Sequence, residues 1–157
     1  MAEITPASDL KTVILTVGNW ERGDDGVGTR IAELLKKRNR TRAIIFDAGV
    51  VPENYLGPVI DARPDRVLIV DACLFNGEPG EFRIFDRAEF GNLMVAGFST
   101  HNPPLSLVAD LIHAETGAEI YLLGIRPKTA TGNQLSPAVQ TALEEIVSFI
   151  ESWVFSD

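Results

Sequence analysis

Cysteine is almost missing from this chain of 157 residues, in which Cys73 is the only one. A single cysteine excludes an intramolecular disulfide and the cysteine-based zinc and iron–sulfur sites. The chain also lacks an apolar run of about 20 residues, the length that crosses a bilayer. Its first residues contain no apolar segment of the signal-peptide kind. We therefore expect a cytoplasmic protein that has no membrane partner.

Positive charge is scarce as well. The 14 Lys and Arg residues are outnumbered by 22 Asp and Glu residues, which gives a net charge of −8 and a pI of 4.7. This balance repels a phosphate backbone, so we expect no nucleic-acid partner. The basic run 36–40 follows a predicted helix, and the carboxyl end of a helix favours cations. We therefore interpret this run as a helix terminus.

The rest of the composition is ordinary for a globular protein, with 45% hydrophobic and 23% charged residues. A chain of this length buries enough surface for a core without staples, and it suits one domain over residues 1–157. Nothing in the sequence signals an obligate interface. We therefore expect a monomer.

Short β-branched segments alternate with amphipathic ones along the chain. The former predict strands, and apolar residues spaced by three and four predict helices. The predicted strands span residues 13–18, 43–47, 66–71, 81–85 and 119–125, and helices should begin near residues 27, 53, 105 and 136. Residues 81–85 alternate polar and apolar side chains, which is typical of an antiparallel edge strand. The pattern predicts an α/β three-layer sandwich with a mostly parallel, doubly wound sheet and one antiparallel strand.

Acidic residues follow three of the predicted strands. Asp24 and Asp25 lie in the glycine-rich loop after the first strand, Asp47 ends the second and Asp71 ends the third. Ligands of open α/β sheets bind beyond the carboxyl ends of the strands. A carboxylate buried there is costly unless it is paired, hydrogen-bonded or bound to a metal. The structural alternatives are a helix N-cap for Asp24 or Asp25 and turn caps for Asp47 and Asp71.

The chain has two histidines. His101 precedes a predicted helix, whose dipole favours the neutral, metal-binding imidazole. His113 falls late in the same helix and is interpreted as a solvated residue. A lone histidine is more often structural than functional. One imidazole and two carboxylates can nevertheless hold a first-row divalent metal and leave positions open. His101 with Asp25 and Asp71 is therefore the candidate metal site.

Two other kinds of chemistry are disfavoured. The glycines of the loop 18–28 do not fit the dinucleotide fingerprint, no phosphate-loop lysine is present, and two aspartates at a helix start would repel a phosphate. A nucleotide-binding domain is therefore a weak alternative, and no nucleotide cofactor is expected. Cys73 would need an activating base to act as a nucleophile, so we interpret it as a small buried hydrophobe.

Several segments of the chain are more specific in combination than any one of them is alone. They are Val17-Gly18-Asn19, Gly23–Gly28, Asp47-Ala48-Gly49, Pro52-Glu53-Asn54, Leu68–Ala72, Pro79-Gly80-Glu81 and Thr100-His101-Asn102. In this order they resemble the motifs of the nickel–iron hydrogenase maturation endopeptidases. The resemblance covers the chain from Val13 to Trp153, and it is strongest to the branch that serves formate-hydrogenlyase-type hydrogenases.

The resemblance implies one parallel-dominated sheet between helices. It also implies cleavage of the C-terminal extension of a hydrogenase large-subunit precursor after nickel has been inserted. The nickel-contacting residues of the family map onto Asp25, Asp71 and His101, and an aspartate linked to activity maps onto Asp47. The expected partner is therefore the nickel-loaded precursor, and the expected metal is nickel borne by that substrate. Asp25 or Asp47 would activate water as the general base.

Other functions use the same candidate residues. One is a non-catalytic nickel-binding accessory protein for hydrogenase assembly, in which case a precursor would not shorten on mixing. Another is a small-molecule metal hydrolase, which would retain its metal during purification. A sensor of substrate-borne metal would instead purify nearly free of metal.

Overall fold

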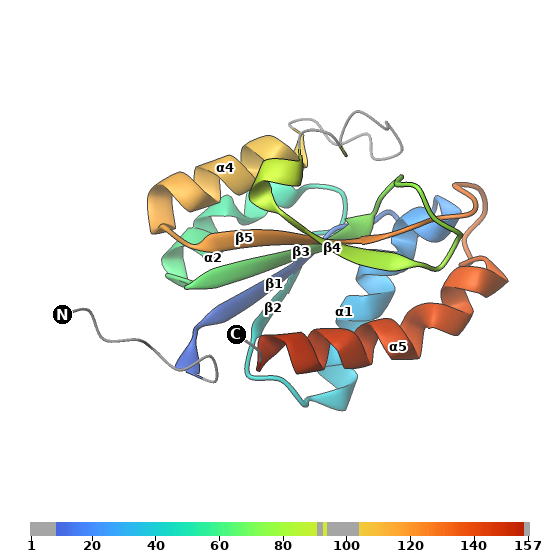
Figure 1. The fold of residues 1–157 in the computed structure, drawn as a ribbon, viewed down its shortest axis with the longest axis horizontal. Coiled ribbons are helices and arrows are strands. Elements are labelled where there is room, and N and C mark those ends of the chain that lie inside the picture. The colour runs from blue at the N-terminus through green and yellow to red at the C-terminus, as the bar shows by residue number, and fades with distance from the viewer. Residues whose placement is uncertain (1–8, 91–92, 94–103, 156–157) are drawn as a thin grey trace.

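The computed structural model describes residues 9–90, 93 and 104–155 (Figure 1). In this part of the chain one sheet has five strands in the order β2-β1-β3-β5-β4. The strands are β1 Thr12–Thr16, β2 Ile44–Asp47, β3 Arg66–Ala72, β4 Phe82–Asp86 and β5 Glu119–Ile125. The helices are α1 Val27–Arg38, α2 Leu56–Asp61, α4 Leu105–Thr116 and α5 Pro137–Val154, with short 3-10 helices η2 Gly23–Gly26, η3 Pro52–Tyr55 and η4 Arg87–Glu89.

The pairing of the strands follows the sequence pattern. Strand β1 pairs in parallel with β2 and β3, and β3 pairs in parallel with β5. Strand β4 pairs antiparallel with β5 at one edge of the sheet. The predicted α/β fold with a mostly parallel sheet and one antiparallel strand is confirmed.

Helices cover both faces of the sheet. Helices α1 and α5 lie on one face, and α2 and α4 lie on the other (Figure 1). Strand β3 is buried along its whole length. Its side chains alternate between the two layers: Val67 and Ile69 pack with the α2/α4 layer, while Leu68 and Val70 pack with the α1/α5 layer. This two-residue period is that of a strand with helices on each side.

The basic run lies where the helix-terminus interpretation puts it. Lys36, Lys37 and Arg38 form the last turn of α1, and Asn39 ends the helix in the left-handed conformation with φ 50°. The guanidinium of Arg38 also forms an ion pair of 2.9 Å with Glu151 of α5. These cations therefore sit beside the negative end of the helix dipole, and one of them links two helices.

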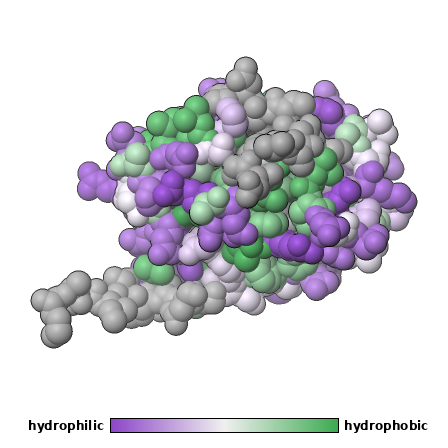
Figure 2. All heavy atoms as spheres, turned by 45° about the horizontal axis from the view of Figure 1, so that its top comes forward, coloured by the Kyte–Doolittle hydropathy of each residue, from purple (hydrophilic) through white to green (hydrophobic). Residues whose placement is uncertain are grey.

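The surface of the described residues mixes polar and apolar side chains. On the face shown in Figure 2, hydrophobic residues form separate patches between hydrophilic ones. The large hydrophobic side chains that are exposed among the described residues are Trp20, Ile44, Val50, Val51, Ile84, Leu107, Leu111 and Phe155. None of the helices in the described ranges is long and apolar enough to span a membrane.

The parallel strands set up two distinct edges. Strands β1, β2, β3 and β5 run in the same direction, so their last residues lie at one edge of the sheet, on the right in Figure 1. We call this the carboxyl edge, and we call the opposite one the amino edge. The loops that follow these strands all lie at the carboxyl edge, where ligands of open α/β sheets bind.

Candidate active site

Asp25 lies in η2, the short helix that follows β1 at the carboxyl edge. Its side chain is almost wholly buried, with 4% exposed. The backbone around it is closed by two hydrogen bonds: Asp25 N–H donates to Arg22 O at 3.1 Å, and Asn19 N–H donates to Asp25 O at 2.8 Å. The turn therefore holds the backbone of Asp25 beside the end of β1.

Asp24, its neighbour, is fully buried and serves a different purpose. Its carboxylate accepts backbone N–H bonds from Lys128 (2.8 Å), Thr129 (3.2 Å) and Ser136 (2.7 Å), and a hydroxyl bond from Ser136 (2.7 Å). These donors belong to the loop between β5 and α5. Asp24 therefore anchors η2 to that loop through hydrogen bonds to a charged acceptor, which are stronger than neutral ones.

The N-cap alternative for these two aspartates is wrong. The residue that caps α1 is Gly26, and no side-chain hydrogen bond caps the helix. Nor does Ser136 cap α5 with its side chain, since its hydroxyl donates to Asp24 instead. Long-range hydrogen bonds have thus displaced the local caps that the sequence favours.

The glycines of the loop serve close backbone packing. Gly23 has φ 55°, and its N–H donates to Gly132 O at 2.6 Å. A Cβ at this position would lie 2.7 Å from Thr131 O, and a Cβ at Gly28 would lie 2.1 Å from Val17 O. Only glycine lets η2 and α1 approach the end of β1 and the loop after β5 this closely. This explains a glycine-rich loop that does not match a phosphate-binding fingerprint.

Asp71 lies near the end of β3, the central strand, with 1% of its surface exposed. It is in register with Gly124 of β5. Because Val70 and Ala72 pack into the α1/α5 layer, the strand period directs Asp71 toward the α2/α4 side. Strand β3 also contacts η2. The structure therefore brings Asp25 and Asp71 to the same edge, on neighbouring segments.

Asp47 ends β2 and is half-buried. Its Oδ1 accepts hydrogen bonds from Thr16 Oγ1 (3.1 Å), Thr29 Oγ1 (3.3 Å) and Gly49 N–H (3.3 Å). The bond to Gly49 is the turn cap that the sequence allows as the structural alternative. The two threonines add contacts to β1 and α1, so this carboxylate is oriented from three sides at the carboxyl edge.

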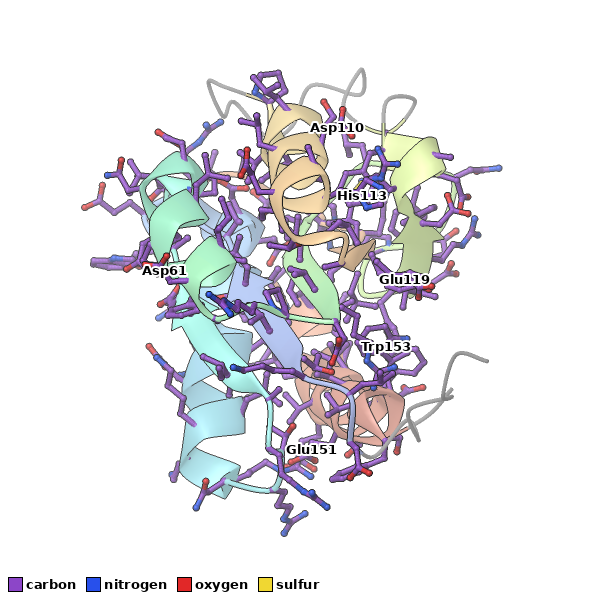
Figure 3. The ribbon with its side chains drawn as sticks, turned by 90° about the vertical axis from the view of Figure 1, so that its left-hand side faces the viewer. Asp61, Asp110, His113, Glu119, Glu151 and Trp153 are labelled. Atoms are coloured by element: carbon purple, nitrogen blue, oxygen red, sulfur yellow. The ribbon has the colours of Figure 1, made fainter. Side chains whose placement is uncertain are left out.

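The two histidines differ in what can be said of them. His101 lies outside the described residues. His113 lies in the last turn of α4, close to the start of β5 (Figure 3), and its Nδ1 is 2.8 Å from Ala118 O. This places His113 at the amino edge, away from the candidate acids. Within the ranges 9–90, 93 and 104–155 no three His, Cys, Asp or Glu residues form a metal-holding cluster, but the predicted set includes His101.

Cys73 follows β3 and is 7% exposed. Burial is the main cause that raises the pKa of its thiol to about 11, the negative charge of Asp71 raises it further, and Arg126 opposes the shift. At neutral pH the side chain is therefore an uncharged thiol and a poor nucleophile. Its burial agrees with the interpretation of Cys73 as a small hydrophobe.

Charge is distributed unevenly among the buried residues of the described chain. The buried carboxylates are Asp24, Asp25 and Asp71, all at the carboxyl edge, whereas Arg66 is buried at the amino edge. Gathering like charges in a buried region favours the binding of a cation. Carboxylate oxygens can also accept a proton from water. The arrangement thus suits metal recognition and general-base chemistry.

Sequence reasoning missed the role of the loop before α5. Asp24 and its partner Ser136 are separated by 112 residues along the chain. No local pattern connects them, and the Ser136-Pro137 pair signals only a helix start. The one sequence hint was the presence of two adjacent aspartates, of which a single one was needed for the candidate metal site.

Comparison with known proteins identifies relatives of the whole domain. Residues 29–153 match the family model described as hydrogenase maturation protease (HycI). The chain is 33% identical over 145 residues to the hydrogenase 3 maturation protease of Escherichia coli K12. The aligned region covers 92% of this chain and 91% of the relative.

Solved structures agree with this match. A crystal structure of a [NiFe] hydrogenase maturation protease, HycI from Thermococcus kodakarensis KOD1, superimposes with a TM-score of 0.81 at 34% identity and covers 94% of each chain. The solution structure of the endopeptidase HycI from Escherichia coli gives a TM-score of 0.82 at 32% identity, covering 92% of this chain and 91% of that one. The chain therefore belongs to the hydrogenase maturation protease family and is an endopeptidase.

Proposed function

We propose that this endopeptidase removes the C-terminal extension of a nickel–iron hydrogenase large-subunit precursor after nickel has been inserted. In this proposal Asp25, Asp71 and His101 complete the coordination of nickel that the substrate carries. The observation that carries the proposal is the placement of Asp25 and Asp71, 4% and 1% exposed, at the same edge of the sheet. Membership of the family supports the reaction class.

The burial of the acids supplies a reason for the order of events. Two carboxylates held largely out of water favour the binding of a cation, because the cation offsets the cost of burying their negative charge. A substrate that brings nickel adds a cation beside these carboxylates, and the same substrate without nickel does not. The protease would thus act as a checkpoint on metal insertion.

The chemistry needs a base at the carboxyl edge. Asp25 or Asp47 takes a proton from water, and the resulting hydroxide attacks the carbonyl carbon of the scissile peptide bond. The C–N bond then breaks, and the proton passes to the leaving amine. Hydrogen bonds from Thr16, Thr29 and Gly49 to Asp47 Oδ1 hold that carboxylate in a fixed orientation for such a role.

A protein substrate also needs a surface to bind. Trp20, Val50 and Val51 are exposed on the loops that follow β1 and β2, with 58%, 50% and 37% of their surfaces exposed. The two loops are joined by the hydrogen bond from Gly18 N–H to Gly49 O at 2.9 Å. Exposed aromatic and aliphatic side chains beside a polar site are typical anchors of protein interfaces.

The test is a cleavage assay with a cognate large-subunit precursor, prepared with and without nickel, in which products are weighed by mass spectrometry. We expect loss of a C-terminal peptide from the nickel-loaded form alone. Cleavage of both forms would retain the peptidase and remove the checkpoint. No cleavage of either form, with partner binding confirmed, would instead support the accessory-protein function.

The identity of the base is tested by two isosteric variants. Asp25→Asn and Asp47→Asn each remove a charge without changing volume, and the variant that lacks the base should cleave about 10²–10⁴ times more slowly. Nickel-dependent binding of the precursor is measured alongside. If Asp25→Asn retained both binding and cleavage, Asp25 would have no role in the site.

A further inference from the structure

A groove of about 830 Å³ opens between the first turns of α1 and α5, on the α1/α5 side of the molecule. Its lining includes Trp20, Gly23, Gly26, Gln134, Leu135 and Gln140. The volume is within the range of about 300–1,000 Å³ that is usual for ligand sites. The nickel-related acids do not line it, so it is a separate feature of the carboxyl edge. We call it the α1–α5 groove.

The groove adjoins the candidate active site through η2. Gly23 and Gly26 line the groove, and the two residues between them in the chain are Asp24 and Asp25. The far wall comes from the loop before α5, which Asp24 anchors to η2 through Ser136. The hydrogen bonds of Asp24 therefore fix the groove and the acidic turn relative to each other.

The polar lining is suited to an uncharged chain. Its two charged residues, Arg30 and Glu33, pair with each other at 2.6 Å. The amide side chains of Asn133, Gln134 and Gln140 each offer both donors and acceptors. Such groups match the alternating N–H and C=O groups of an extended peptide. An anionic phosphate would instead need a cation that is not already paired.

An aromatic anchor stands at one side of the groove. Trp20 is 58% exposed, and its backbone packs on η2 so tightly that a Cβ at Gly26 would lie 2.5 Å from Trp20 Cα. Its backbone is therefore positioned before any ligand arrives. A preplaced, exposed tryptophan supplies apolar contact area at a small cost in conformational entropy.

We propose that the α1–α5 groove binds the C-terminal extension of the precursor, as an extended peptide that leaves the cleavage point at the acidic turn and runs between α1 and α5. This inference rests on the proposed function, because it names where the removed segment lies. A groove of this size admits an extended chain end but not a folded domain.

The first test compares two precursors, one with its full extension and one cut to two residues beyond the scissile bond. For the full precursor, Gln134→Ala and Gln140→Ala, which alter two amides of the groove lining, should each raise KM by about tenfold with kcat little changed. For the short precursor the same variants should have no effect. Leu107→Ala, which removes an exposed hydrophobe of α4, and Glu144→Ala, one turn along α5 from Gln140, are the matched controls.

Equal effects of the groove variants on both precursors, or no effect on either, would overturn the groove assignment while the cleavage itself still stood. The failure of the proposed function is a different result, namely no cleavage of any precursor by the wild-type protein.

The second test does not need cleavage. The chain has two tryptophans, so Trp153→Phe leaves Trp20 as the only indole reporter. A synthetic peptide with the sequence of the extension should change Trp20 fluorescence, and Gln140→Ala should weaken that binding about tenfold. A response to ATP and none to the peptide would assign the groove to a nucleotide. No response to either would remove the groove as a binding site for the extension.

Discussion

The two ends of β3 carry buried charges of opposite sign, and the structure treats them differently. Arg66 begins the strand at the amino edge and Asp71 lies five residues later near the carboxyl edge, about 16 Å away at the rise of a strand. Both side chains are almost fully buried. The groups that surround each charge indicate whether it has a structural role or belongs to the candidate site.

At the amino edge the cation is compensated by neighbours from the same chain. The Arg66 Nε donates to Thr12 Oγ1 at 2.9 Å, a terminal nitrogen donates to the carbonyl of Val154, and the guanidinium lies 4.4 Å from the ring centroid of Trp153. These contacts tie β1, β3 and the end of α5 together. Arg66 is therefore a structural residue.

At the carboxyl edge like charges are gathered instead. Asp24 receives backbone and hydroxyl donors and has a structural role like that of Arg66. Asp25 and Asp71 are buried close to it on neighbouring segments. Burying several carboxylates together costs desolvation free energy, and a cationic ligand offsets that cost. Asp24 therefore serves the architecture, and the proposed recognition of nickel places Asp25 and Asp71 beside the metal.

The largest expected effect is on cleavage by the acids of the proposed site. Asp71→Asn should lower kcat/KM for nickel-loaded precursor by about 10²–10⁴-fold, because it removes a charge at the reacting edge. Because the substitution keeps the side-chain volume, the free energy of unfolding of Asp71→Asn distinguishes a role at the reacting edge from a structural role. Denaturant titration and the cleavage assay measure the two quantities. The control is Asp110→Asn, at an exposed aspartate of α4. A large loss of stability in Asp71→Asn would make Asp71 a structural residue.

Asp24→Asn should behave in the opposite way to Asp71→Asn. An amide has one acceptor oxygen in place of two, so its nitrogen must face either the Ser136 N–H that donates to Oδ1 or the three donors that reach Oδ2. We expect the free energy of unfolding to fall by about 2–3 kcal/mol, the cost of leaving buried donors unsatisfied. Urea denaturation of this variant and of Asp61→Asn, an exposed aspartate that ends α2, measures the difference. Equal stability of the two variants would contradict the anchoring role.

Arg66→Lys tests the structural role of the buried cation at the amino edge. Lysine keeps the charge but loses the fork that reaches Thr12 and Val154 and the planar stack on Trp153. The free energy of unfolding should fall by about 1–2 kcal/mol. The kcat/KM of cleavage at a temperature well below unfolding should be unchanged. Arg40→Lys, at an exposed arginine after α1, is the control, and a selective loss of cleavage in Arg66→Lys would break the division between the two edges.

The smallest effect concerns Cys73. Burial raises the pKa of this thiol to about 11 from 9.0, so the unfolded chain releases the proton first as the pH rises. The stability that the neutral thiol contributes is therefore complete below pH 9 and is lost between pH 9 and pH 11. Relative to Cys73→Ala, the wild-type protein should lose about 1 kcal/mol between pH 8 and pH 10.

The Cys73→Ala variant is also expected to cleave the precursor at the wild-type rate at pH 7.5. Denaturant titrations across the pH range and the cleavage assay provide the two measurements. A pH-independent gap between the two proteins would mean that the thiol titrates normally in the folded state, and loss of cleavage would give Cys73 a catalytic part.

Much of the fold was predictable because its signals are local. The buried run of β3 and the apolar stripe of α5 each follow from the residue pattern of one element. The parallel order of the strands follows from the helices between them. The position of the acids at the carboxyl edge needed nothing more than their place after each strand.

The amino-acid sequence by itself determined the α/β class, the edge at which Asp25, Asp47 and Asp71 lie, and the family of the chain. Only the tertiary structure decided that Asp24 anchors η2 to the loop before α5, because the donors to its carboxylate lie 104 to 112 residues away. It likewise decided that a groove opens beside η2. Side-chain pattern reports which layer a residue faces, whereas the partner of a buried charge depends on which distant loop the folded sheet places beside it.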